Sequence, residues 1–260
     1  MSFKFFDTNI VLDSLYPKRE FFSKFQKQFH DEFLLKRLCI TSTVDIEIFK
    51  VSHREMEFLI QEIYNSIRPI DWDSLDADGR DEVIKKMKEN LKKSIKSTDN
   101  LPFVLGALDL ETKLILTLTK EEIIENICPN FPYLFNRNLK INVSNHFLIT
   151  PIDGNNMDKT ETLKSTIKDI NTQYNLFKPK QSKDFNILSE LIMLLEYGAR
   201  FSNNETLSLD LINFYSRDEP FIKNINNFTN KVKEKSNKNN NELLIEEALA
   251  KIIAKNPYLN

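Results

Sequence analysis

The sequence has 260 residues, of which 41% are hydrophobic and 28% charged. This balance is typical of a globular protein and excludes a wholly disordered chain or one built of membrane spans. The formal net charge is −2, so any contact with nucleic acid must come from local basic patches. The two cysteines, Cys39 and Cys128, and the three histidines lack the spacing of a zinc site or of a Cys–His nucleophile. With only four glycines, the sequence contains neither a Walker-type nor a dinucleotide-binding glycine loop.

The length suits one large α/β domain or a domain that carries a substantial insertion. No apolar stretch reaches the length of a membrane span, and the first residues lead directly into a strand-like segment without a basic leader. We therefore expect a cytoplasmic protein without a membrane partner.

Strand-like and helical segments alternate over the first 60 residues. Residues 3–6 are mostly apolar, end at an acid and predict a buried parallel strand, and residues 20–37 carry phenylalanines at helical spacing. Residues 38–41 (LCIT) predict a second strand, and a second helix is expected from about Thr43. Its apolar positions are Val44, Ile48, Val51 and Phe58. Strand, helix, strand, helix predicts a parallel sheet.

Residues 66–180 lack this alternation and predict a mostly helical insertion within a single domain of residues 1–260. The clearest element is at residues 81–96, where an apolar stripe lies beside a lysine stripe. The lysines are Lys85, Lys88, Lys92 and Lys96. They could follow a nucleic-acid backbone, but a solvated helix face is the commoner explanation. Trp72 is expected to be a partly buried anchor and not a base-stacking platform.

Three further elements are expected in this middle region. The sequence TKEE at residues 119–122 matches a capping box that opens a helix. Residues 160–174 have a helical pattern. Residues 148–152 (LITPI) predict a strand that Pro151 restricts to an edge or an end of a sheet.

The alternation returns in the last third of the chain. Residues 184–199 have a strong helical face with Gly198 near its end, and residues 207–215 predict a buried strand. Residues 231–241 are of low complexity and are expected to be a solvated loop or a frayed helix end. A closing helix is expected from Glu242 to about Lys255, with Ile252 on its apolar stripe.

Four acids occupy equivalent places in this layout. Asp7 follows the first strand, Glu47 lies early in the helix after the second, Asp184 opens a later helix, and Asp218 follows the last clear strand. In a parallel sheet these places converge on the crevice at the carboxyl ends of the strands. Four carboxylates packed together repel one another unless divalent cations such as Mg²⁺ or Mn²⁺ neutralise them. Such a centre hydrolyses phosphodiesters, because the metal activates a water and stabilises charge on the attacked phosphate.

The segments around these acids resemble the PIN-domain nuclease family. They are residues 5–13 (FFDTNIVLD), 40–49 (ITSTVDIEIF), 183–190 (KDFNILSE) and 214–221 (FYSRDEPF). In the family, the first holds the opening strand and first acid, and the second holds a helical glutamate. The third holds an acid at a helix start, and the fourth holds Thr or Ser, one residue and Asp before a phenylalanine. Phe185 and Asn186 replace the small residues that usually follow the third acid.

The resemblance covers roughly half of the chain and is stronger to the larger bacterial members with a helical insertion than to compact toxin-type ones. It implies an α/β PIN-like fold of three layers with a central parallel sheet. The implied activity is metal-dependent endonucleolytic hydrolysis of single-stranded RNA. Asp7 and Asp218 would be the principal ligands of Mg²⁺ or Mn²⁺, and Glu47 and Asp184 would complete the metal shell, in part through water. Asn9 and Ser216 of these motifs would orient ligands or the phosphate.

Two other functions use the same residues. One is a catalytically inactive PIN-like module that binds RNA or a protein, and the other is a structure-selective DNA nuclease. A homo-oligomer and an antitoxin or defence-system partner also stay open. Lys178, Lys180 and Lys183, beside Asp184, could follow a nucleic-acid backbone, and Lys180 and Lys183 are the predicted substrate-binding residues.

Each acid also has an ordinary structural explanation. Asp-Thr-Asn after a strand is common turn chemistry, and Asp184 suits the N-cap of a helix. Ser216 with Glu219 matches a capping box, which would leave Asp218 as a first-turn acid. The occurrence of all four acids in order favours the metal site over capping alone.

Overall fold

The computed structural model describes residues 2–35, 37–96, 100–152, 157–200 and 206–259. The chain divides into two compact units. Unit 1 comprises Met1–Leu12, Lys24–Glu47 and Ser144–Asn260, and unit 2 comprises Asp13–Ser23 and Ile48–Val143. No helix of the described residues is long and apolar enough to cross a membrane.

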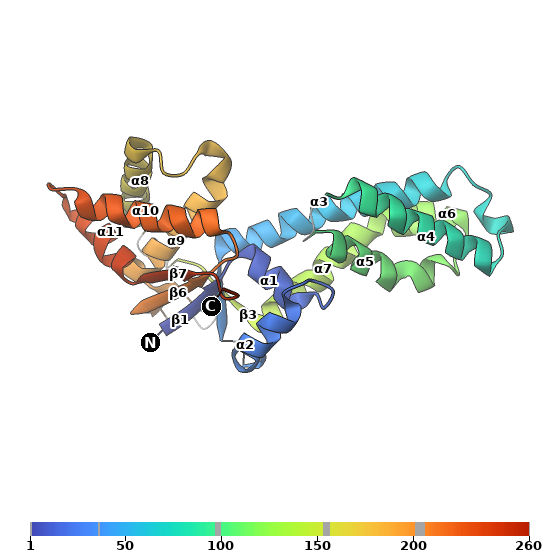
Figure 1. The fold of residues 1–260 in the computed structure, drawn as a ribbon, viewed down its shortest axis with the longest axis horizontal. Coiled ribbons are helices and arrows are strands. Elements are labelled where there is room, and N and C mark those ends of the chain that lie inside the picture. The colour runs from blue at the N-terminus through green and yellow to red at the C-terminus, as the bar shows by residue number, and fades with distance from the viewer. Residues whose placement is uncertain (1, 36, 97–99, 153–156, 201–205, 260) are drawn as a thin grey trace. The chain divides into compact units, whose positions relative to one another are not determined.

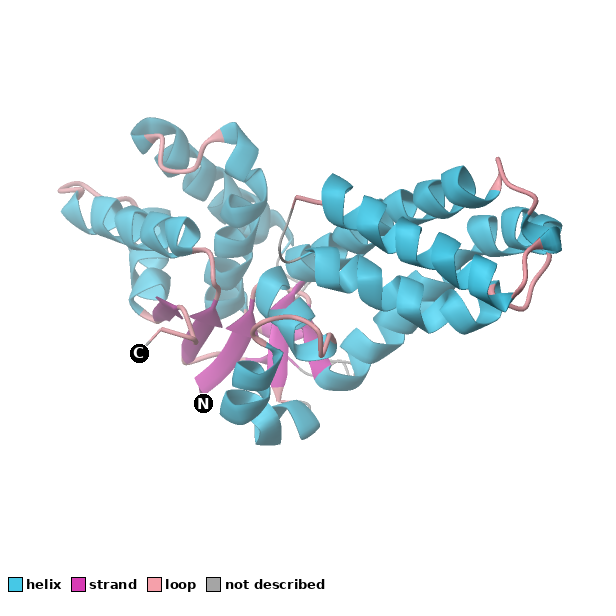
Figure 2. Ribbon diagram, turned by 45° about the vertical axis from the view of Figure 1, so that its right-hand side comes forward, coloured by secondary structure: helices cyan, strands magenta, loops and turns pink. Residues whose placement is uncertain are grey.

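Unit 1 is built on a five-stranded sheet in which every pairing is parallel, in the order β3-β2-β1-β6-β7. Figure 2 shows these strands side by side in magenta. They are β1 (Ser2–Phe6), β2 (Leu38–Thr41), β3 (Phe147–Thr150), β6 (Leu211–Tyr215) and β7 (Ile252–Lys255). The predicted α/β class and parallel sheet are confirmed. The strand expected near residue 148 is an edge strand that ends before Pro151.

Helices lie on both faces of this sheet (Figure 1). One face is covered by α2 (Phe22–Leu34), because Phe6 of β1 packs edge-on against Phe29 with ring centroids 5.1 Å apart. The opposite face is covered by α9 (Ser182–Tyr197) and α10 (Glu219–Glu234), and the rings of Phe214 in β6 and Phe221 in α10 have centroids 5.4 Å apart. Side chains that alternate between the two faces thus give each helical layer aromatic partners. Two further helices, α8 (Met157–Tyr174) and α11 (Asn240–Ala250), pack against α9 and α10 on this second side.

The chain after residue 240 differs from the expected closing helix. Helix α11 ends at Ala250, and the expected helical position Ile252 opens β7, where it pairs with Ile212 of β6. Lys251 has φ −98° and ψ 3°, which ends the helix. A short apolar run can form either a helix or a strand. Here it forms a strand because the edge of β6 supplies main-chain hydrogen bonds.

Three other boundaries also differ. Turn chemistry was one structural explanation of the Asp-Thr-Asn segment, but α1 (Thr8–Leu15) begins there and buries three consecutive apolar residues. Only Leu211–Tyr215 of the expected strand at residues 207–215 joins the main sheet, while β5 (Thr206–Leu207) pairs antiparallel with β4 (Ala199–Arg200). Helix α10 continues to Glu234, so the low-complexity segment begins as helix.

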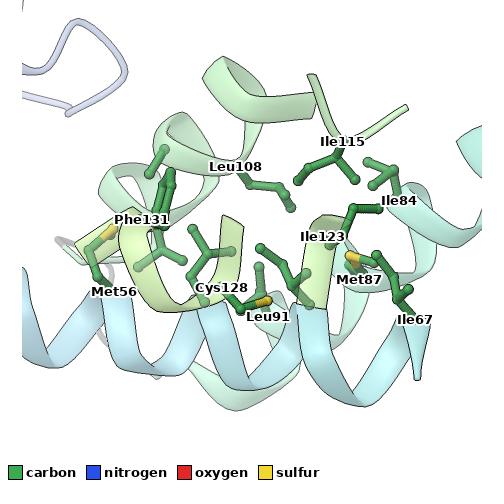
Figure 3. Packing of buried hydrophobic residues seen from close by; sticks show 14 of the residues in the cluster. Met56, Ile67, Ile84, Met87, Leu91, Leu108, Ile115, Ile123, Cys128 and Phe131 are labelled. Carbon is green, nitrogen blue, oxygen red and sulfur yellow. The ribbon is translucent and has the colours of Figure 1, made fainter. Parts of the chain in front are cut away.

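Unit 2 consists of helices around its own apolar core. The long helices are α3 (Ser42–Ile67), which starts in unit 1, α4 (Ala77–Ser94), α5 (Asn100–Ile115) and α7 (Cys128–His146), which ends in unit 1. The short elements are η1 (Trp72–Ser74), α6 (Lys120–Glu122) and η2 (Ile123–Ile127). Figure 3 shows Met56 and Ile67 of α3 in one cluster with Leu91 and Phe131 of the neighbouring helices. The capping box at Thr119 is confirmed. Phe58, expected on the buried face of α3, is 53% exposed and is not part of this core.

Trp72 is more deeply buried than expected. Its side chain is 0% exposed, and its indole N–H donates a hydrogen bond to the carbonyl of Leu118 at 3.0 Å. The guanidinium carbon of Arg80 lies 5.0 Å from the indole ring centroid. Trp72 therefore anchors the core of unit 2 and offers no free ring for stacking on a base.

Candidate functional site

The site lies where the strand order of the sheet reverses. From β1 the chain runs outward through β2 to β3, and then returns to the other side of β1 as β6. Open α/β sheets bind ligands at such a reversal, in the crevice outside the carboxyl ends of the two adjacent strands. Phe6 pairs with Tyr215, so Asp7 and Ser216 are neighbours just beyond these strand ends.

The carboxylate of Asp7 is buried and held by three hydrogen bonds. Its Oδ1 accepts from the backbone N–H of Thr8 at 2.7 Å, and its Oδ2 accepts from Ser216 Oγ at 2.8 Å and Asn9 Nδ2 at 3.2 Å. Asp7 is 1% exposed. Such donors satisfy the oxygens of a buried carboxylate, which would otherwise be costly to remove from water. Asn9 and Ser216, expected to orient ligands or the phosphate, thus both fix the direction of Asp7.

Glu47 reaches the site from the second turn of α3. Its Oε2 accepts a hydrogen bond from the hydroxyl of Thr8. The start of α3 is held by Glu190 of α9, which accepts hydrogen bonds from the backbone N–H of Thr43 at 3.0 Å and from its hydroxyl at 2.7 Å. Glu190 therefore ties the helix of Glu47 to the helix of Asp184. No pattern in the sequence indicated this pair.

Asp184 and Asp218 lie at two helix starts near the same strand ends. Helix α9 packs on β2 and β6, the strands that flank β1. It begins at Ser182, so Asp184 is in its first turn and is not the N-cap that was expected as an alternative. Asp218 is the N-cap of α10, and its Oδ1 accepts from the N–H of Phe221 at 3.0 Å.

The alternative capping box of Ser216 and Glu219 is wrong. Helix α10 begins at Glu219, and Ser216 lies two residues before the N-cap. The Ser216 hydroxyl accepts a hydrogen bond from the N–H of Asp218 at 3.0 Å and donates to Asp7. Ser216 therefore joins the loop of Asp218 to the carboxylate of Asp7.

The ammonium of Lys183 lies among three of the four acids. Its Nζ is 2.8 Å from Glu47 Oε1, 3.6 Å from Asp7 Oδ1 and 3.9 Å from Asp184 Oδ1. Burial lowers the pKa of Lys183, but the charges of Asp7 and Glu47 outweigh it and raise this pKa to about 12. The residue expected to bind substrate thus lies inside the acidic cluster as a permanent positive charge.

All four acids share one electrostatic environment. Burial raises the pKa of Asp184 to about 6, the charge of Lys183 opposes this, and the charges of Asp7, Asp218 and Glu47 add to it. The structure therefore brings the four predicted acids together with Asn9, Ser216 and Lys183. All of these residues belong to unit 1.

The cluster matches a hard divalent cation in the type of its donors. Carboxylate oxygens are the ligands that Mg²⁺ and Mn²⁺ prefer. Within the described ranges of the chain, no three acidic, histidine or cysteine side chains are placed to share a metal ion as they stand. The position of the Lys183 ammonium nevertheless shows that Asp7, Glu47 and Asp184 converge on positive charge. These three acids and Asp218 are the residues that would hold a metal.

An open groove of about 680 Å³ lies beside this cluster. It runs between α10 and the segment around η4 (Pro179–Gln181), and Glu219, the residue after Asp218, is part of its wall. Its polar lining also includes Lys178, Lys180, Gln181, Lys223, Asn224 and Asn227. Lys180, expected to bind substrate, therefore lies in the groove and not in the acidic cluster.

Comparison with protein-family models, curated proteins and solved structures gives no match to this chain. The fold and site define an α/β protein with an acidic cluster at the reversal of a parallel sheet. The resemblance of the four motifs to PIN domains remains a hypothesis that rests on those residues.

The raised pKa of Asp184 predicts how stability depends on pH without metal. The carboxyl group titrates near 3.8 when unfolded and near 6 when folded, so the folded state binds more protons between these values. The stability from this group is therefore present below about pH 4 and is lost as the pH rises to about 6. In EDTA, melting temperatures measured from pH 4 to pH 7 should fall more for wild type than for Asp184→Asn. Parallel curves would contradict the raised pKa.

Proposed function

We propose that this protein is a PIN-like, metal-dependent endonuclease that hydrolyses single-stranded RNA. The observation that carries the proposal is the convergence of the predicted acids at the reversal of strand order. Asp7, Glu47 and Asp184 all lie within 4 Å of the Lys183 ammonium. Asp218 is joined to Asp7 through the hydroxyl of Ser216. Helix capping accounts for Asp218, but it accounts for neither Glu47 nor Asp184. Acids that only cap helices or stabilise turns need not lie close together, whereas the ligands of a shared cation must converge on one crevice.

In this proposal the four acids hold Mg²⁺ or Mn²⁺, which supplies an activated water and stabilises charge on the phosphate. The other residues of the site position these acids. Ser216 and Asn9 orient Asp7, and Thr8 holds Glu47. Glu190 secures the helix start from which Glu47 projects. Such supporting hydrogen bonds tune metal sites, because they fix the direction and the charge of each ligand.

The groove beside Asp218 supports a nucleic-acid substrate. Lys178, Lys180 and Lys223 line it, and none of the three has an ion-pair partner among the described residues. Lysines along an open groove attract a phosphate backbone, while the amides of Asn224 and Asn227 offer hydrogen bonds to sugars or bases. This local basic lining matters because the whole chain carries a net charge of only −2. The choice of RNA over DNA rests on the family resemblance alone.

Lys183 favours a second candidate function. Its ammonium already neutralises Glu47 and lies close to Asp7, so the cluster forms an internal ion network without a metal. A PIN-like module with such a network would bind RNA or a protein in the same groove without cleaving it. The two candidates differ in their response to divalent metal.

The response to Mn²⁺ is the test of the proposed enzyme. Mn²⁺ at one hundred times its dissociation constant stabilises the folded state by about 2.7 kcal/mol. For a chain of this size that corresponds to a rise of several degrees in melting temperature. Differential scanning fluorimetry with Mn²⁺ and with EDTA should show this rise for wild type and not for Asp7→Asn.

Glu32→Gln is the matched control for this measurement. Glu32 is an acid of unit 1 that pairs with Lys4 on the α2 side of the sheet, outside the cluster. Its variant should keep the full response to Mn²⁺. A wild-type melting temperature that Mn²⁺ leaves unchanged would exclude the metal-dependent enzyme and favour the binding module.

A further inference from the structure

We infer that Lys183 is a built-in counter-ion that neutralises the acidic cluster in the absence of metal and that a divalent cation must displace. This inference rests on the proposed metal site and adds to it a device that regulates its occupancy. It assigns Lys183 a role different from the contact with substrate that the sequence predicted.

The contacts of Lys183 carry the argument. Its ammonium lies within 4 Å of carboxylate oxygens from three separate elements, namely the end of β1, helix α3 and helix α9. The side chain is 35% exposed, whereas the side chain of Asp7 is 2% exposed. The lysine therefore has a route to solvent, while the carboxylate that it neutralises is fixed in the interior. Displacement moves the lysine and leaves the acids in place.

The lone pairs of Asp7 show that the lysine and a metal compete for the same atom. Oδ2 accepts hydrogen bonds from both Ser216 and Asn9, which occupies its two acceptor positions. Oδ1 accepts one bond, from the N–H of Thr8, and so retains one free position. The Lys183 ammonium lies 3.6 Å from this oxygen. A metal bound by Asp7 would have to use Oδ1, where an ammonium and a divalent cation would repel each other strongly.

This arrangement predicts two effects of opposite direction in Lys183→Met, whose side chain is of similar length but uncharged. Without metal, the variant should melt at a lower temperature than wild type, because Asp7, Glu47 and Asp184 lose their counter-ion. With metal, it should bind Mn²⁺ more tightly, because nothing has to leave the site. A lysine that only stabilises the fold would give the first effect alone, and a lysine that only contacts substrate would give neither.

The experiment is isothermal titration of metal-free protein with MnCl₂, together with melting curves in EDTA. Lys183→Met should bind Mn²⁺ at least about tenfold more tightly than wild type and melt earlier in EDTA. The control is Lys180→Met, which removes the same charge three residues earlier from a side chain that lines the groove. Its affinity for Mn²⁺ should stay within about twofold of wild type, because an exposed charge at that distance is screened by salt.

Each other outcome overturns the inference in a recognisable way. Equal affinities of wild type and Lys183→Met would remove the counter-ion role and leave the proposed metal site standing. An equal increase in Mn²⁺ affinity in Lys180→Met would show that the effect comes from long-range charge and not from displacement of Lys183. No binding of Mn²⁺ by any variant would remove the proposed metal site as well. If Lys183→Met does not fold, Lys183→Gln is the substitute, because its amide can still donate a hydrogen bond to Glu47 while the charge is lost, and the same criteria apply.

Discussion

Cleavage of single-stranded RNA should fall by more than about a hundredfold in Asp7→Asn, and EDTA should abolish it in wild type. The substitution keeps the shape of the side chain but removes the charge at the buried centre of the cluster. The measurement is the initial rate of cleavage of a labelled RNA, with a DNA of the same sequence in parallel, in Mn²⁺ and in EDTA. Faster cleavage of the DNA would favour the structure-selective DNA nuclease. Binding of RNA without any cleavage would favour the inactive module.

Asp218→Asn separates catalysis from helix capping in the same assay. Asparagine caps helices about as well as aspartate, so the start of α10 should be preserved and the melting temperature in EDTA should change little. The loss of a proposed metal ligand should nevertheless slow cleavage by a factor comparable to that in Asp7→Asn. Cleavage at the wild-type rate would reduce Asp218 to a helix cap.

Truncation of Trp72 should have the largest effect on stability. Trp72→Ala should lower the free energy of unfolding by about 3–5 kcal/mol, because it empties a fully buried site and leaves the carbonyl of Leu118 without its indole donor. Urea denaturation followed by circular dichroism measures this change. Wild-type fluorescence reports on unit 2 in the same titration, because Trp72 is the only tryptophan.

The control for this prediction is Leu110→Ala in the same unit. Leu110 is 76% exposed, so its truncation removes little buried surface and should change the free energy of unfolding by less than about 0.5 kcal/mol. Similar losses in the two variants would show that burial of Trp72 does not determine the stability of this helical core.

Much of the parallel sheet could be predicted because its strands are short apolar runs with clear ends. Residues 38–41 are all buried and are bounded by a charged segment and a helix start, so length and composition were sufficient. The same criteria failed at Ile252, where an apolar run follows a genuine helix without a break that the sequence reveals. The strand forms there because it pairs with the edge of β6, which lies roughly 40 residues earlier in the chain. Local periodicity carries no information about so distant a partner.

The candidate site, like the sheet, could be predicted only in part from the sequence. The four acids could be selected because the ends of parallel strands and the starts of the following helices converge by topology alone. The position of Lys183 could not be predicted, because the direction of a long side chain in a first helical turn depends on how α9 packs on the sheet. The pair of Thr43 and Glu190 could not be predicted either, because its members are 147 residues apart and belong to no recognised motif.

The pairing of β1 with β6 also sets when the site can exist during synthesis. Ser216, which holds Asp7, follows it by 209 residues, and at 5–20 residues per second a ribosome needs on the order of 10–40 s to make that stretch. For most of this interval the nascent chain has Asp7 and Glu47 but lacks β6 and Asp218, which follows it. If the proposed nuclease activity is present, the message that encodes the chain meets only an incomplete site while translation proceeds.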